Sequence, residues 1–233
     1  MSEKYFKKYI KGIKSVSKES IKSSLHSNIG FENILITTVG REWLLDNKIK
    51  ITGGILKSRV LTFINNDNLK PTKSYIRESI FNIIKIDSKM ICLDLFSGSG
   101  ILSAEAISRG AKSSTLIENN TKTCNQIQNQ FKILGIKNYE LYKLDVLKYL
   151  KLKDAVFYDL IFIDAPFKSN LLELTIEIMD DLNYFEKNIY LYFEQNKQDY
   201  NQKLVPIISK THNVIKDLSI GDVSYTIAKK RDI

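Results

Sequence analysis

The feature that most constrains the fold of this chain is a strand–turn–helix rhythm that begins at residue 90 and then repeats. Residues 90–95 form an apolar run typical of a buried strand, residues 101–109 a short helix that Gly110 ends, and residues 115–117 the next strand. The later units are a helix at 121–134 stopped by Gly135, strands at 139–143 and 160–163, a helix at 171–182, and strands at 189–193, 211–215 and 224–228. Alternating units predict an α/β fold with a mostly parallel sheet flanked by helices. Such a sheet binds ligands at the carboxyl ends of its strands.

The chain before residue 90 has a different organisation. Two short β-prone runs, 50–52 and 59–63, surround a Gly-Gly pair and predict a small hairpin. Apolar residues recur at helical spacing after Lys70-Pro71-Thr72, and this helix would place Lys73 and Arg77 one turn apart, away from its apolar face. Residues 1–30 are rich in lysine and serine and predict a mobile tail, while 31–47 favour one or two short helical faces. We expect a basic extension over 1–48, a hairpin and helix over 49–89, and the repeating strand–helix part as a domain over 90–233.

The charge of the chain is concentrated in its first part. The 233 residues hold 35 Lys and Arg against 26 Asp and Glu, a net charge of +9. Residues 1–89 contain 17 basic and 8 acidic side chains, whereas residues 90–233 contain 18 of each. A basic segment attached to a balanced domain indicates a polyanionic partner, most often a nucleic acid. The alternative is a Lys-, Ile- and Asn-rich composition inherited from an AT-rich genome.

Composition also excludes several classes of protein. The chain has no run of about 18 apolar residues that could cross a membrane, and no apolar segment of a secretory signal near its start. Two cysteines and two histidines are too few for a disulfide framework or a zinc site of these residues. We therefore expect a cytoplasmic monomer without a metal or a membrane partner. An organellar transit peptide is the alternative for the Ser-rich start, although the lack of arginine there argues against it.

A glycine-rich turn joins the first strand of the repeating part to its helix. Asp94-Leu95-Phe96-Ser97-Gly98-Ser99-Gly100 contains two glycines that let the backbone approach a ligand closely, and the helix start offers free N–H groups. A dinucleotide site would have a third glycine or alanine where this chain has Ser103. Asp94 suits a ligand with ammonium and sulfonium centres better than a pyrophosphate. The turn therefore predicts S-adenosylmethionine binding, with a plain tight turn as the alternative.

Two further acids follow the next two strands. Glu118 lies about 20 residues beyond the glycines, where a carboxylate accepts hydrogen bonds from a ribose diol. Asp145 follows the third strand and suits an adenine amino group. Alone, Glu118 could be a solvated acid and Asp145 a helix N-cap. Acids after three successive strands favour a shared site.

The element Asp164-Ala165-Pro166-Phe167 follows the fourth strand. An amine on a nucleobase is a poor nucleophile, and an acceptor for its N–H groups stabilises the transition state of an attack by its nitrogen. The Asp164 carboxylate and the Ala165 carbonyl can accept these bonds, while Phe167 can stack on the base. The alternative is a buried strand followed by a proline turn.

These motifs together resemble a known family. The segments 51–59, 70–82, 93–100, 105–111, 164–167 and 221–225 resemble the class I, Rossmann-like S-adenosylmethionine-dependent methyltransferases, and within them the bacterial enzymes that methylate guanine N2 in small-subunit (16S) ribosomal RNA. The resemblance covers residues 49 to 229, and it implies that the hairpin and helix of 49–89 contact RNA and that 90–233 is the methyltransferase domain. Two differences from the family are Ala165 in place of a proline and a longer N-terminal extension.

The resemblance implies a role for each candidate residue. The cofactor would be held by Asp94, Phe96, Gly98, Gly100, Glu118 and Asp145, and the base by Asp164, Ala165, Pro166 and Phe167. The phosphate contacts to ribosomal RNA, or to its assembling particle, would be Lys57, Arg59, Lys70, Lys73 and Arg77. Two rival functions remain at this stage. One is an adenine-N6 DNA methyltransferase, and the other is an RNA assembly factor that binds the cofactor but has lost turnover because of Ala165.

Overall fold

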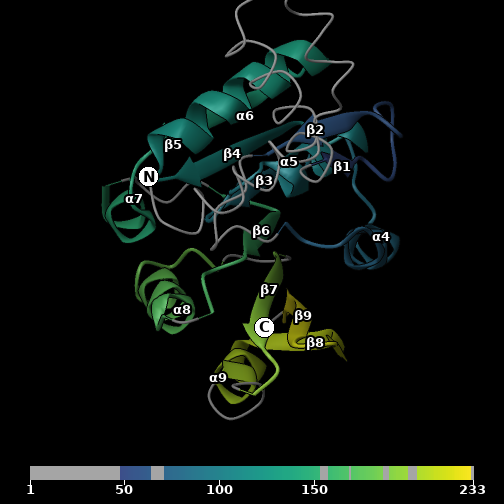
Figure 1. Ribbon diagram of the computed structural model, residues 1–233. Helices are drawn as coiled ribbons and strands as arrows, with labels where there is room; N and C mark the ends of the chain where they lie inside the picture. The colour runs from purple at the N-terminus through teal and green to yellow at the C-terminus, as the bar shows by residue number, and fades with distance from the viewer. Residues whose placement is uncertain are drawn as a thin grey trace, which may run out of the picture. The chain divides into compact units, whose positions relative to one another are not determined.

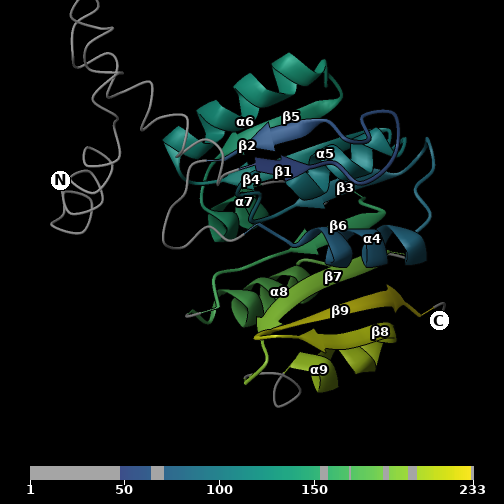
Figure 2. The ribbon, with the colours of Figure 1, turned by 45° about the vertical axis from the view of Figure 1, so that its right-hand side comes forward.

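A parallel sheet with two antiparallel strands at one edge forms the centre of the protein (Figures 1 and 2). The computed structural model describes residues 48–63, 71–152, 157–167, 169–185, 189–198 and 204–231. Within these residues the seven strands lie in the order β5-β4-β3-β6-β7-β9-β8. Their bounds are β3 Ile91–Asp94, β4 Ser113–Glu118, β5 Tyr139–Lys143, β6 Leu160–Ile163, β7 Tyr190–Asn196, β8 His212–Ile220 and β9 Val223–Lys230. The pairs from β5 to β7 are parallel, and β9 pairs antiparallel with both β7 and β8.

Helices cover both faces of this sheet. They are α4 Ser74–Ile83, α5 Ile101–Ser108, α6 Thr121–Leu134, α7 Val146–Leu152, α8 Leu171–Asp181 and α9 Leu204–Thr211. One core cluster joins α4, α5 and α6 to one face, and a second cluster joins α7, α8 and α9 to the other. In Figure 1, α7 and α8 lie on the left of the sheet and α4 on its right. The sequence-based prediction of a Rossmann-like α/β fold is confirmed.

The strands in the middle of the sheet are largely apolar because both faces are covered, and β6 is apolar and buried along its whole length. On β6, Leu160 and Phe162 pack in the first cluster, whereas Ile161 and Ile163 pack in the second. The side chain of Asp164 therefore follows Phe162 onto the face of α4 and α5. The same alternation puts Asp94 on that face, after Cys92.

Residues 49–89 share the core of the domain that follows. The strands β1 (Lys48–Lys50) and β2 (Val60–Thr62) pair, as the hairpin prediction required. Ile51 and Leu61 are buried in the first core cluster, and Gln126 of α6 donates to the Thr62 carbonyl at 2.6 Å. Residues 49–233 accordingly form one compact unit. The predicted tail and helical faces of residues 1–47 lie outside the described residues.

Two helices were absent from the sequence-based interpretation. α7 has only two turns, and its start at Asp145 was considered only as an alternative to a ligand contact. α9 holds Pro206 in its first turn, where a proline is tolerated, although the pattern favoured a strand from Thr211. The strand instead begins at His212. In the described part of the chain every helix is too short or too polar to span a bilayer.

The prediction that Arg77 lies away from the apolar face of its helix is wrong. Arg77 is only 1% exposed and lies on the buried face of α4, beside Ile76 and Ile80. Its Nε donates to Glu105 Oε1 at 3.1 Å, Nη2 donates to the Lys50 carbonyl at 2.6 Å, and Nη1 donates to the Thr72 carbonyl. The guanidinium is committed to protein groups, so it is not a phosphate contact.

We expect Arg77→Ala to lower the free energy of unfolding by about 3 to 5 kcal/mol, because it leaves the buried Glu105 carboxylate without this partner. Urea denaturation followed by circular dichroism measures this loss. The matched control is Lys73→Ala, an exposed residue one turn earlier, which should change stability by less than about 0.5 kcal/mol. Equal stability of the two variants would contradict the structural role of Arg77.

Candidate active site

Acids follow or end five neighbouring strands on the carboxyl side of the parallel sheet. β4 ends at Glu118 and β3 at Asp94, while Asp164 comes directly after β6 and Asp145 is the second residue after β5. The fifth acid, Glu194, lies on β7 and was not among the predicted site residues. Its signal in the sequence was the same as that of the others, an apolar run that ends in an acid. The structure thus brings the predicted acids to the edge where such sheets bind ligands.

The glycine turn is shaped by backbone conformations that favour glycine. Gly98 and Gly100 have φ values of 51° and 73°, in the left-handed region. The Gly98 N–H donates to Glu118 Oε2 at 3.1 Å, and the Gly100 N–H donates to the Ser97 carbonyl at 2.7 Å. The carboxylate of Glu118 therefore fixes the turn as well as facing the site. Phe96, at the start of the turn, is partly exposed and packs against the second core cluster.

One carboxylate oxygen of Asp94 has a hydrogen-bond partner among the described residues, and the other has none. Its Oδ2 accepts a hydrogen bond of 2.9 Å from the Ser103 hydroxyl, which in turn accepts one of 2.8 Å from Ser114. Its Oδ1 is buried and has no hydrogen-bond partner among the described residues. Burial raises the pKa of Asp94 to about 7, the Ser103 bonds oppose the shift, and the charge of Glu118 adds to it. A buried carboxylate oxygen without a partner is what a cationic ligand group would satisfy.

Glu118 and Asp145 both bind backbone groups. The second oxygen of Glu118 accepts from the Asn120 N–H at 2.8 Å, and burial raises its pKa although these backbone bonds lower it. Each carboxylate oxygen can accept two hydrogen bonds, so a ribose hydroxyl could still be accommodated. Asp145 Oδ1 accepts from the Lys148 N–H at 3.1 Å, so it caps α7, which was the alternative weighed for it. A contact from Asp145 to an adenine amino group stays a prediction.

The element after β6 lies at the same edge. Asp164 is partly exposed, and its Oδ2 accepts from the Thr72 hydroxyl at 3.3 Å. Burial, followed by the charges of Glu194 and Asp94, raises its pKa well above the usual range. Ala165 is buried in the second core cluster, Pro166 is exposed and Phe167 is partly exposed. The Ser169 hydroxyl and N–H both donate to the Pro166 carbonyl and close this turn, at 2.6 and 3.2 Å.

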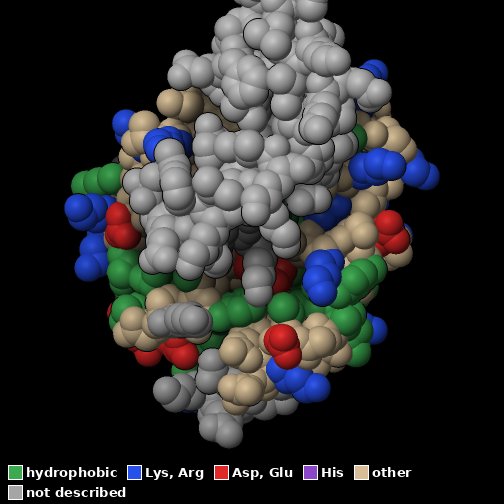
Figure 3. All heavy atoms as spheres, in the orientation of Figure 1, with side chains coloured by type: hydrophobic (Ala, Val, Ile, Leu, Met, Phe, Trp, Pro, Cys, Tyr) green, Lys and Arg blue, Asp and Glu red, His purple; other side chains and the backbone are tan. Residues whose placement is uncertain are grey.

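The five basic residues predicted to contact RNA differ in their exposure. Lys57, Arg59 and Lys73 are exposed, Lys70 lies outside the described residues, and Arg77 is buried as described above. In Figure 3, Lys and Arg side chains lie toward the margins of the drawn face, while acidic side chains lie both at its margins and near its centre. The exposed basic side chains could hold a phosphate backbone while the acids of the site meet a neutral base.

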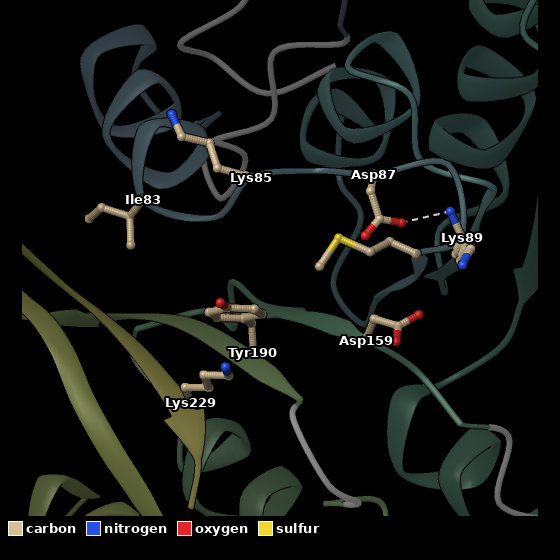
Figure 4. A pocket seen from close by; sticks show the side chains of 8 residues that line it. Ile83, Lys85, Asp87, Lys89, Asp159, Tyr190 and Lys229 are labelled. Carbon is tan, nitrogen blue, oxygen red and sulfur yellow. Dashed lines mark hydrogen bonds between the residues drawn. The ribbon is translucent and has the colours of Figure 1, made fainter.

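A hollow of about 460 Å³ lies at the opposite edge of the sheet (Figure 4). Its lining includes Met90, Asp159 and Tyr190, which precede or open β3, β6 and β7. Asp159 Oδ2 accepts the Ile91 N–H at 2.7 Å, which caps the start of β3. This hollow is therefore separate from the row of acids. In the described part of the chain, no group of three or more His, Cys, Asp or Glu residues could hold a metal ion.

Comparison with known proteins identifies the family. The family model with the description "conserved hypothetical protein 95" matches residues 49–229, which is most of the chain. The chain belongs to this family. A similar curated protein from Buchnera aphidicola, named ribosomal RNA small subunit methyltransferase D, is 40% identical over 154 residues, which are 66% of this chain and 81% of the relative. The protein of that name from Escherichia coli K12 is 28% identical over 78% of this chain and 90% of its own length.

Solved structures support the same assignment. A putative methyltransferase from Escherichia coli has a TM-score of 0.69 at 25% identity, over 78% of this chain and 98% of that one. A putative methylase from Haemophilus influenzae has a TM-score of 0.67 at 26% identity, over 79% of this chain and 99% of that one. The resemblance seen in the sequence, to a family of S-adenosylmethionine-dependent ribosomal RNA methyltransferases, is confirmed.

Gly100 offers a test of the turn's packing. A Cβ at Gly100 would lie 3.3 Å from the Phe131 ring, whereas a Cβ at Gly135, which has a similar φ of 70°, would meet nothing within 4 Å. We expect Gly135→Ala to cost about 1 kcal/mol of stability from backbone strain alone. Gly100→Ala should cost about 1 to 3 kcal/mol more, because it also forces Phe131 to move. Thermal unfolding of both variants measures the difference, and equal losses would contradict the close packing of the turn.

Proposed function

We propose that this protein transfers a methyl group from S-adenosylmethionine to the exocyclic N2 amine of a guanine in small-subunit ribosomal RNA. The observation that carries the proposal is the row of acids beside the left-handed glycine turn, in a chain whose relatives are named ribosomal RNA small subunit methyltransferases. An unpaired guanine can leave its stack at small cost, so a loop or an end of the RNA suits the site.

The residues present fit this cofactor. The buried, unpartnered Oδ1 of Asp94 could accept a bond from the ammonium group, and Glu118 could accept bonds from the ribose hydroxyls. The positive φ of Gly98 holds the turn in a conformation that keeps side chains away from the ligand's path. When bound, S-adenosylmethionine would supply an electrophilic methyl group. Phe96 and Asp145 are proposed to contact its adenine end.

The substrate side of the site is proposed around Asp164. Its partly exposed carboxylate would accept an N–H of the guanine amine and favour the nitrogen as it becomes tetrahedral, while Phe167 would stack on the base. Lys57, Arg59, Lys70 and Lys73 are proposed phosphate contacts, and the buried Arg77 is not among them.

The decisive experiment uses the purified full chain with methyl-labelled S-adenosylmethionine and either small-subunit RNA, its assembled particle, or duplex DNA. The proposal expects label in N2-methylguanosine from an RNA substrate after digestion to nucleosides. Label in N6-methyladenine of DNA would support the first rival function. Cofactor binding without any transfer would support the assembly factor that has lost turnover.

The raised pKa of Asp94 makes cofactor binding depend on pH. A cationic ligand needs the Asp94 carboxylate ionised, and in the free protein its pKa is about 7. Affinity should therefore fall by up to about tenfold per pH unit as the pH drops below 7. It should also decline above about pH 8, where the α-ammonium group of the ligand loses its own proton. Calorimetry with S-adenosylmethionine from pH 5 to 9 measures this. The control, Asp94→Asn, should bind weakly at every pH, and a flat profile for the native protein would contradict the role of Asp94.

Asp164 should act on the chemical step and not on cofactor binding. Asp164→Ala should lower the single-turnover rate by about 100-fold to 1,000-fold, the scale for loss of a preorganised transition-state partner. Asp164→Asn should lose less, because its amide oxygen still accepts a hydrogen bond. Rapid-quench measurements at saturating cofactor and RNA report this step. Native rates in Asp164→Ala would place the chemistry elsewhere.

A further inference from the structure

Glu194 lies beside Asp164 on the neighbouring strand. β6 and β7 are parallel and pair Phe162 with Tyr192 and Ile163 with Phe193, so the next pair in this register is Asp164 with Glu194. Adjacent strands in a sheet lie about 4.8 Å apart, and side chains in register point to the same face. Phe162 and Tyr192 both belong to the first core cluster, so both carboxylates lie on the face of α4 and α5.

The two carboxylates differ in exposure. Glu194 is 5% exposed, whereas Asp164 is partly exposed at the edge of the site. Asp164 can therefore reach a substrate, while Glu194 lies behind it. Glu194 has no part in holding the cofactor or the base in the function proposed above.

Hydroxyl groups hold the pair in place. The buried Tyr192 hydroxyl donates to Glu194 Oε1. The Thr72 hydroxyl donates to Asp164 Oδ2 at 3.3 Å and also lies within hydrogen-bonding reach of Glu194. Since this hydroxyl carries one proton, it can donate to only one carboxylate at a time. Thr72 is in turn fixed through its carbonyl by Arg77, whose charge is already paired with Glu105.

We propose that Glu194 is a positioning residue for Asp164, and that it sets the proton state in which Asp164 meets the substrate amine. This inference rests on the function proposed above. Two carboxylates side by side in a buried site do not both ionise freely. The Tyr192 hydroxyl favours the anion of Glu194, and this anion makes Asp164 hold its own proton to a higher pH. The Thr72 hydrogen bond to Asp164 opposes this effect in part.

The directions in which the pKa values of Asp164 and Glu194 are shifted agree with this role of Glu194. Burial and then the charges of Glu194 and Asp94 raise the pKa of Asp164, whereas the Thr72 hydrogen bond lowers it. Burial also raises the pKa of Glu194, and the bonds from Tyr192 and Thr72 lower it. The titratable groups that interact with the pair are Asp94 from β3 and Tyr192 from β7, while Arg77 from α4 interacts with Tyr192 and with Glu105.

The proton of the reaction then has a defined destination. The guanine N2 electron pair forms the bond to the methyl carbon, and the electron pair of the broken sulfur–carbon bond stays on sulfur. The nitrogen, which is now positively charged, loses one proton to the ionised carboxylate of Asp164. That proton leaves to water when the product departs, which restores the starting state of the pair.

The test is the pH profile of the single-turnover rate at saturating cofactor and RNA. The rate should rise with pH as Asp164 ionises, and Glu194→Gln should move the midpoint of this rise to lower pH by about one unit or more, because it removes the neighbouring negative charge. Thr72→Val should move the midpoint to higher pH, because the pair loses a hydrogen-bond donor. The control Glu177→Gln, at an exposed position on α8, should leave the midpoint unchanged. A rate that falls equally at every pH in Glu194→Gln would reduce Glu194 to a structural role and overturn the inference.

A second measurement does not depend on activity. Because the pKa values of both acids are raised in the folded protein, their stabilising effect is present at low pH and is lost as the pH rises through these values. When the pH is raised from 5 to 8, the free energy of unfolding should therefore fall more for the native protein than for the Asp164→Asn or Glu194→Gln variant. Equal losses would overturn the pairing of the two acids. If RNA is not methylated at all, the proposed function fails, while this stability comparison still decides whether the pair exists.

Discussion

The candidate site depends on the hydrogen bonds and ion pairs that the buried carboxylate of Glu105 makes. This carboxylate is fully buried on α5 and accepts from the Thr52 N–H at 2.6 Å, the Thr52 hydroxyl at 3.1 Å, and the guanidinium groups of Arg77 and Arg109 at 3.1 and 3.3 Å. One side chain therefore ties the hairpin and α4 to the helix that begins at the glycine turn. Burial of a carboxylate costs folding free energy unless the group is paired and hydrogen-bonded. Removal of one partner should therefore also weaken the contacts of the remaining partners.

This network reaches the substrate side of the site through Arg77. The guanidinium that pairs with Glu105 also holds the Thr72 carbonyl, and the Thr72 hydroxyl contacts Asp164. Arg109 lies against the Phe81 ring, with its guanidinium carbon 4.8 Å from the ring centroid, and close to Gly53. A side chain at Gly53 would meet this guanidinium at 2.4 Å, which explains a glycine there without any need for a ligand. The described residues between 49 and 89 are thus part of the framework of the site.

Much of the fold could be predicted because the central parallel strands are largely apolar and glycines follow the ends of α5 and α6. Strand β6 and helix α6 have the bounds that the sequence pattern predicts. The bounds of α6 are well defined because Asn120 caps its start and Gly135 ends it with a left-handed φ. The acids that follow β3, β4, β5 and β6 could be predicted from their places after those strands. The position of Arg77 could not, because helical spacing shows which residues share a face and does not show a buried carboxylate on another helix that would draw a cation inward. Glu194 also follows an apolar run, but its place beside Asp164 depends on the register of β6 with β7, which the sequence does not show.

The central claim is that the row of acids serves methyl transfer to the exocyclic amine of guanine. The most direct measurement compares two otherwise identical RNA substrates, one with guanosine and one with inosine at the nucleotide that receives the methyl group. Inosine lacks only the N2 amine, so it leaves the rest of the base for stacking on Phe167. We expect methyl transfer to the guanosine RNA and none to the inosine RNA. Equal transfer to both would show that the methyl group goes to another atom and would contradict the proposed role of the acids.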